Sequence, residues 1–252
     1  MTRPDPFAPP SGVVPPERST LAQAQSVRPE PRYGALASPG ASPAPTVPAV
    51  LAGAPTGLAA AASVLAVVWT VLQLGFFLTS LAAVEPYEAA LAARRSLMTV
   101  VTPYDSLAVL AFPVQAAMFV VGCLWLQQGR RLAAALSPSV RQVRRPVWVW
   151  LGWVVPFVFL WFPYQVVRDV RAAAVGGTAS RRLGWWWACW LVGLWSSNQA
   201  SLVSMGLRAT DPEVVPVFEG ISFAATAAAC ALWVGLVREI TRGLQARRAP
   251  GL

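Results

Sequence analysis

Four long apolar runs constrain the fold of this chain more than any other feature. They cover residues 57–84, 106–127, 183–207 and 214–237, and each has the roughly 20 residues that an α-helix needs to cross about 30 Å of hydrocarbon. With 56% hydrophobic and only 12% charged residues, the chain has too little polar surface to cover a soluble core. The sequence therefore predicts an all-α integral membrane protein with four transmembrane helices in a polytopic domain over 57–245.

A fifth apolar stretch, residues 147–174, is interrupted by prolines. Pro156 and Pro163 each remove a backbone amide, and the part before Pro156 is only half as long as a span. The part after Pro163 carries Arg168 and Asp169, which are too polar for lipid at mid-bilayer. We predict a Pro-broken re-entrant segment that enters and leaves on one side of the membrane. One continuous, proline-kinked span is the alternative.

The arginines favour the re-entrant arrangement. Residues 128–146 contain five arginines and no acidic residue, as is typical of a cytoplasmic loop. If 147–174 re-enters, thirteen arginines of the membrane domain lie on the cytoplasmic side and three outside; if it crosses, the numbers are six and ten. The sequence thus predicts a multi-pass protein of the cytoplasmic membrane with both termini in the cytoplasm.

Both ends of the chain lie outside the predicted membrane domain. Residues 1–56 are rich in proline, alanine and serine and have no apolar period, so this Pro-rich tail is predicted to be disordered. Residues 246–252 form a short basic tail.

Composition argues against several kinds of chemistry. The chain has no histidine, which excludes imidazole bases and histidine metal ligands. Cys123, Cys189 and Cys230 share no short spacing, so neither a zinc site nor a disulfide framework is predicted. We expect no catalytic residues, no metal and no cofactor, and no enzymatic activity. The net charge of +9 comes from arginines beside apolar runs, which indicates a membrane rather than nucleic acid.

Several motifs around the central segment are similar to a known family. They are Gly152-Trp153, Pro156, Leu160-Trp161, Pro163-Tyr164-Gln165, Asp169 and Trp185-Trp186-Trp187. Together they resemble the bacterial domain of unknown function 4328 family over roughly residues 57–245. The resemblance implies a multi-span bacterial membrane protein of a kind common in actinobacteria, and it supplies no activity. The family's Arg-x-Asn after its second apolar run is absent here, where Gln127-Gln128-Gly129-Arg130-Arg131 stands instead.

A candidate structural or ligand-binding motif combines the central segment with the polar patch of the 183–207 run. Its members are Gly152, Trp153, Pro156, Trp161, Pro163, Tyr164, Gln165, Arg168, Asp169, Asn198 and Gln199. Asn198 or Gln199 is predicted to hydrogen-bond the broken backbone between 156 and 164, because unsatisfied backbone groups at membrane depth are costly. An anionic headgroup reaching Arg168 is the expected ligand. Glu219 is expected to be solvated at the interface.

Small residues recur every fourth position in the last two runs, which predicts close packing of the two helices. They are Gly193, Ser197 and Ser201 in one run and Gly220, Ala224 and Ala228 in the other.

Two classes of function remain open from the sequence. The first is a non-enzymatic binding or scaffold module that contacts membrane lipids, including anionic headgroups, or a protein partner or second copy of itself. The alternative is a small transporter or channel subunit gated by the re-entrant segment.

Overall fold

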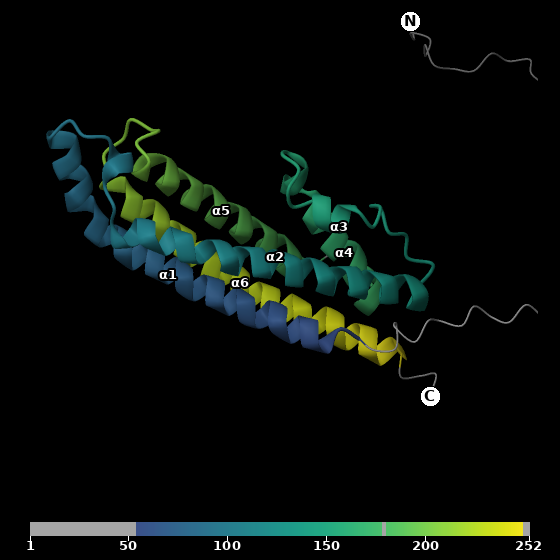
Figure 1. Cartoon of the computed structure of the whole chain (residues 1–252). Coiled ribbons are helices and arrows are strands. Elements are labelled where there is room, and N and C mark those ends of the chain that lie inside the picture. The colour runs from purple at the N-terminus through teal and green to yellow at the C-terminus, as the bar shows by residue number, and fades with distance from the viewer. Residues whose placement is uncertain (1–53, 178–179, 249–252) are drawn as a thin grey trace, which may run out of the picture. The chain divides into compact units, whose positions relative to one another are not determined.

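The computed structural model describes residues 54–177 and 180–248, and every regular element in these ranges is helical (Figure 1). The predicted disordered tail falls outside these ranges, except for its last three residues. The elements are α1 (Thr56–Ala92), η2 (Leu97–Thr99), α2 (Pro103–Leu136), α3 (Trp148–Leu151), η3 (Val158–Leu160), α4 (Phe162–Val175), α5 (Arg181–Ser204) and α6 (Val214–Arg248).

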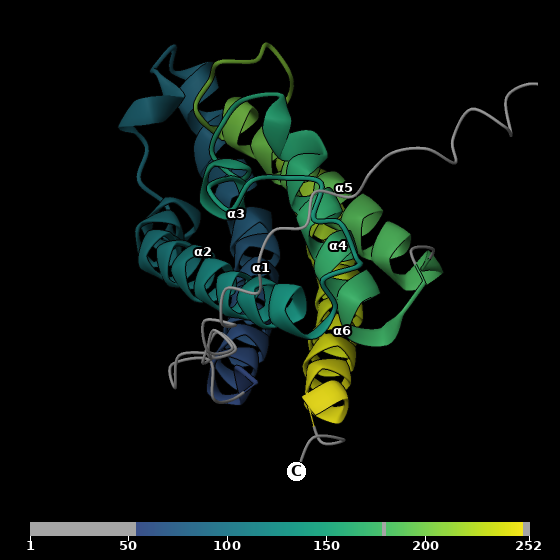
Figure 2. The ribbon, with the colours of Figure 1, turned by 90° about the vertical axis from the view of Figure 1, so that its right-hand side faces the viewer.

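The four long helices alternate in direction along the chain. α6 packs against both α5 and α1, and α1 packs against α2, while α3 and α4 lie over the half of the bundle where α2 and α6 end (Figures 1 and 2). The connections α1–α2 and α5–α6 lie together at the opposite end. α6 is therefore the helix around which the others are arranged.

Three of the long helices, α1, α2 and α6, are long and apolar enough to cross a membrane in the part of the chain that is described. The prediction of four spans plus a re-entrant segment is therefore wrong: the described residues contain three such helices, and the long helix that is not among them is α5. This helix has 24 residues, but its five tryptophans and the polar run Ser196–Gln199 lower its mean hydropathy. The apolar residues on either side of this polar run, together with the length of the stretch, led to the prediction of a span.

α1, α2 and α6 extend beyond the apolar runs that predicted them, whereas α5 ends at Ser204, before the predicted end at 207. α1 continues through Pro86 to Ala92, and α2 continues past Arg130 and Arg131 to Leu136. Glutamate, glutamine and arginine are good helix formers, so a helix does not stop where its apolar run stops. The start of α2 is fixed by a capping box in which Thr102 and Asp105 bond each other's backbone amides.

The central segment is broken, as predicted, and it is not one kinked helix. Its helical pieces have 4, 3 and 14 residues, each too short to cross a membrane. Pro163 lies in the first turn of α4, where its missing amide costs nothing. Phe157, between α3 and η3, has a φ of 62°, which is uncommon for a residue other than glycine.

The predicted stripes of small residues are half right. A Cβ at Gly193 would lie 2.9 Å from Thr226 Oγ1, so the backbones of α5 and α6 approach closely there. Gly220 instead faces a phenylalanine of α1, and Ala224 and Ala228 are exposed. The face of α6 that meets α5 is therefore rotated away from the predicted stripe.

Candidate functional site

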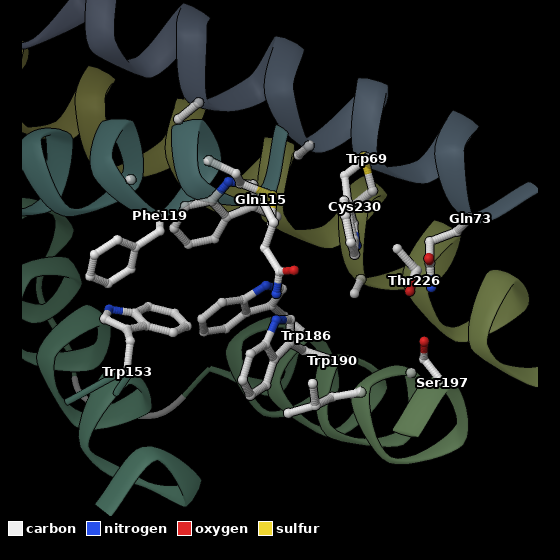
Figure 3. A pocket seen from close by; sticks show the side chains of 18 of the residues that line it. Trp69, Gln73, Gln115, Phe119, Trp153, Trp186, Trp190, Ser197, Thr226 and Cys230 are labelled. Atoms are coloured by element: carbon white, nitrogen blue, oxygen red, sulfur yellow. The ribbon is translucent and has the colours of Figure 1, made fainter. Parts of the chain in front are cut away.

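A cavity of about 440 Å³ lies between α2 and α5, and residues of α1 and α6 complete its lining. We call it the α2–α5 groove. α2 and α5 make little direct contact with each other. Figure 3 shows the side chains that line the gap between them. At the end nearest α4 the groove is bounded by Trp153, which follows α3. Its volume lies within the range of about 300–1,000 Å³ that small-molecule pockets occupy.

Aromatic rings form the walls near Trp153. Trp190 meets Trp153 edge-on at 5.7 Å and stacks on Trp187 at 4.7 Å. On the same helix as Trp190, Trp186 stacks on Trp233 of α6 at 5.0 Å. Such ring pairs add stability beyond their buried area, and together they hold this end of the groove open in a fixed shape.

Six amide or hydroxyl side chains line the groove: Gln73, Gln115, Ser197, Asn198, Ser201 and Thr226. Gln115 of α2 extends into it from one side, and Ser197 faces it from the other (Figure 3). Asn198 also lines the groove and is exposed. The lining is otherwise dominated by tryptophan, phenylalanine, alanine, leucine and glycine. This combination suits a mainly apolar ligand with a few hydrogen-bonding groups.

The prediction that Asn198 or Gln199 hydrogen-bonds the backbone between 156 and 164 is wrong for the part of the chain that the structure describes. Gln199 accepts a hydrogen bond from Arg208 instead, and no hydrogen bond joins Asn198 to 156–164. The backbone is held by Trp187, whose indole Nε1 donates to the Leu160 oxygen at 2.9 Å. The reason is depth: Asn198 lies eleven residues, or about 16 Å, further along α5 than Trp187, and the segment does not extend that far.

Two more contacts tie the segment to α2. The Trp150 indole donates to Gln127 Oε1 at 2.9 Å, and the Cys123 thiol donates to the Val149 oxygen at 3.2 Å. The tryptophan cluster at 185–187 was visible in the sequence. Its role as hydrogen-bond donor was missed because indoles beside arginines are also typical of a membrane interface.

The remaining members of the motif have identifiable packing roles. A Cβ at Gly152 would lie 2.5 Å from the Trp148 oxygen and 3.3 Å from Phe162 Cβ, so only glycine fits between α3 and α4. Tyr164 packs against Trp187 with ring centroids 6.4 Å apart. Pro156 and Trp161 are exposed.

The polar side chains of α4 bind the loop before α3. Buried Asp169 accepts hydrogen bonds from the Val143 amide at 2.9 Å and from Arg168 at 2.8 Å. Gln165 Oε1 accepts from Arg144 Nε at 2.6 Å. Arg168 is thus already paired with a carboxylate, and these residues hold the arginine-rich loop onto α4.

A buried carboxyl group at the other end of the bundle was missed. Glu219 is only 1% exposed, contrary to the expected solvated position, and its Oε1 accepts a hydrogen bond from the Tyr104 hydroxyl at 2.7 Å. The two residues are 115 positions apart, so no local pattern pairs them. Within 54–177 and 180–248, no three acidic or cysteine side chains gather as metal ligands.

Comparison with known proteins gives one match. The family model described as "Domain of unknown function (DUF4328)" matches residues 88–242. No curated protein and no solved structure matches the chain. The match includes α2 to α5 completely, and with them both walls of the α2–α5 groove.

Proposed function

Because the chain belongs to the domain of unknown function 4328 family, whose description gives no activity, we propose a function from the geometry of the α2–α5 groove. The helical domain is a non-enzymatic, membrane-embedded module that binds a lipid. The groove takes the hydrocarbon chain of the lipid, and arginines at one end of the bundle attract an anionic headgroup.

The observation that carries this proposal is the groove itself. Three of the four long helices that line it, α1, α2 and α6, are apolar enough to cross a membrane. Its walls consist mostly of aromatic and aliphatic side chains. In a membrane, a gap between two helices that barely touch is open to lipid from the side. Hydrocarbon fills such a space without leaving polar groups unpaired. The apolar lining supports a binding module over a transporter or channel subunit.

The charge distribution supports an orientation and a headgroup preference. We call the end where α2 and α6 finish the basic end, and the opposite end the acidic end. The basic end has two acidic residues, Asp169 and Glu239, and thirteen arginines: 130, 131, 141, 144, 145, 168, 171, 181, 182, 238, 242, 247 and 248. The acidic end has Arg94, Arg95 and Arg208, and the acids Glu85, Glu88, Asp105, Asp211, Glu213 and Glu219.

This asymmetry supports placing the basic end on the cytoplasmic side of the membrane. Arginines near a membrane surface attract anionic lipids by about 1 kcal/mol each. Trp153, at the end of the groove nearest the basic end, has an indole Nε1 that is buried and unpartnered. It is therefore a hydrogen-bond donor available to an ester or phosphate oxygen near the lipid headgroup.

Photocrosslinking tests the proposal. The full chain is reconstituted into bilayers that contain a phospholipid with a diazirine in its acyl chain, in one series with an anionic and in another with a zwitterionic headgroup. Labelled peptides are mapped by mass spectrometry. We expect labelling concentrated on the facing sides of α2 and α5, and stronger with the anionic lipid.

A matched pair of variants distinguishes the groove from ordinary lipid contact. Gly122 lines the groove and Gly184 lies on α5 away from it, and a Cβ at either position meets nothing within 4 Å. Gly122→Phe should fill the groove and reduce the concentrated labelling severalfold, while Gly184→Phe should leave it unchanged. Equal labelling of all lipid-facing helices in both variants would contradict the proposed function.

A further inference from the structure

Three buried side-chain oxygens near the acidic end have no hydrogen-bond donor. They are Gln73 Oε1 of α1, Ser196 Oγ of α5 and Glu219 Oε2 of α6, on side chains that are 3%, 0% and 1% exposed. Buried polar atoms are nearly always hydrogen-bonded in folded proteins. Three unpartnered oxygens on three different helices therefore point to a missing partner.

Helix register brings the three residues to similar levels along the bundle. Ser222 donates to the Gly193 oxygen at 3.1 Å and accepts from Gln73 Nε2 at 2.6 Å, so α1, α5 and α6 meet at that level. Because α5 and α6 run in opposite directions, Ser196, three residues after Gly193, lies level with Glu219, three residues before Ser222. This level is about 4.5 Å along the bundle axis, less than one helical turn, from the level of Gly193 and Ser222.

The orientation of the Gln73 amide follows from its neighbours. The one hydroxyl proton of Ser222 goes to the Gly193 oxygen. The Ser222 oxygen must therefore accept from the amide nitrogen of Gln73, which leaves the amide oxygen free. The hydrogen-bond network thus fixes which atom of the Gln73 side chain is the unpaired oxygen.

No cation compensates Glu219 in the described part of the chain. Its sole hydrogen-bond donor is the neutral hydroxyl of Tyr104, next to which Asp105 accepts from the Tyr87 hydroxyl at 3.0 Å. From the α5–α6 loop, Arg208 donates to Gln199 and not to Glu219. An ionised carboxylate in this position would be buried without a countercharge, at a large cost in free energy.

We propose that Glu219, Gln73 and Ser196 form a binding site for one monovalent cation, a proton or Na⁺. A proton on Glu219 Oε2 would turn this acceptor into a donor toward one of the other two oxygens. Na⁺ would be held by all three oxygens. A divalent cation is unsuitable, because a single carboxylate neutralises only one of its charges. Intramembrane carboxyl groups commonly mark ion sites, and this one adjoins the α2–α5 groove, whose lining includes Gln73.

The surroundings favour entry of a cation from the acidic end. Glu219 lies five residues, about 7.5 Å, from the first residue of α6. The exposed carboxylates of Glu85, Glu88, Asp211 and Glu213 lie around this end, and a concentration of negative charge raises the local concentration of cations.

Infrared spectroscopy and thermal melts test the site on the full chain in bilayers. In sodium-free buffer at neutral pH, the C=O stretch of a protonated carboxylic acid should be present in the wild type and absent in Glu219→Gln. If Na⁺ competes for the site, NaCl but not choline chloride should remove this band and raise the melting temperature. Ser196→Ala should weaken the sodium effect severalfold and retain the band.

Glu213→Gln is the matched control, because Glu213 is exposed one residue before α6; it should behave as the wild type. A band without a sodium effect identifies the proton as the ligand, and a sodium-dependent melt that Glu219→Gln abolishes identifies Na⁺. If the wild type and Glu219→Gln have the same carboxyl spectrum and neither responds to NaCl, the site does not exist. The neutral glutamine has nearly the same shape, so misfolding is not expected to obscure the comparison.

Discussion

Trp187→Phe should release the segment between α3 and α4 from the bundle. The Trp187 indole is the donor to the Leu160 oxygen, at 2.9 Å, and its ring stacks on Trp190 at 4.7 Å. Phenylalanine keeps an aromatic ring in this place but removes the N–H group. The Leu160 oxygen then loses its partner while the surrounding protein still limits access by water.

The size of the effect follows from these two losses. A carbonyl that loses its hydrogen-bond partner costs about 1–3 kcal/mol when fully buried, and the lower part of that range applies because Leu160 is 39% exposed. The smaller ring gives up part of a stacking interaction worth about 0.5–1.5 kcal/mol. Together these give about 2 kcal/mol, or roughly 30-fold in the opening equilibrium of the segment.

Hydrogen exchange in bilayers measures this opening directly. The amides of Phe159, Leu160 and Trp161 are hydrogen-bonded within the segment, so their exchange should accelerate roughly 30-fold in Trp187→Phe while amides of α6 keep their protection. Trp185→Phe is the control, since Trp185 is 65% exposed, and it should change nothing. Equal protection of 159–161 in both variants would refute the anchoring role of the indole.

Three further predictions concern packing and topology. In a denaturant titration, Gly243→Ala should lower the free energy of unfolding by about 1–3 kcal/mol, because its Cβ would lie 2.8 Å from a backbone oxygen of α4. Gly184→Ala is the control and should not lower it, because the space around its Cβ is open. Arg247→Met should lower the free energy of unfolding by about 1 kcal/mol in that titration. It removes hydrogen bonds of 2.8 Å to Ala174 of α4 and 3.0 Å to Ser137, the residue after α2. An unchanged free energy of unfolding would show that these bonds are not formed. In a chain without native cysteines, Ala92→Cys should react with an impermeant reagent outside the cell and Gln245→Cys should not; the reverse pattern would contradict a cytoplasmic basic end.

Properties that depend on neighbours along the chain were accessible from the sequence. Apolar runs predicted α1, α2 and α6 because a helix that crosses hydrocarbon must be continuous and apolar. Pro156 and Pro163 predicted the broken segment because each lacks an amide. The motifs from Gly152 to Trp187 also indicated the family, which the match over residues 88–242 establishes.

Properties that depend on which faces meet were decided by the tertiary structure. Hydropathy does not say that α5 packs along α6, because Trp186 and Trp187 are covered by neighbouring rings while Trp185 and Trp195 of the same helix are exposed. Asn198 and Trp187 were both candidates to hold the broken backbone, and the depth to which the segment extends selected Trp187. Glu219 became a buried acid because Tyr104, 115 residues away, is brought against it. Sequence patterns fix local conformation through covalent geometry and solvation, whereas the pairing of distant side chains follows from how whole helices rotate and align to fill space.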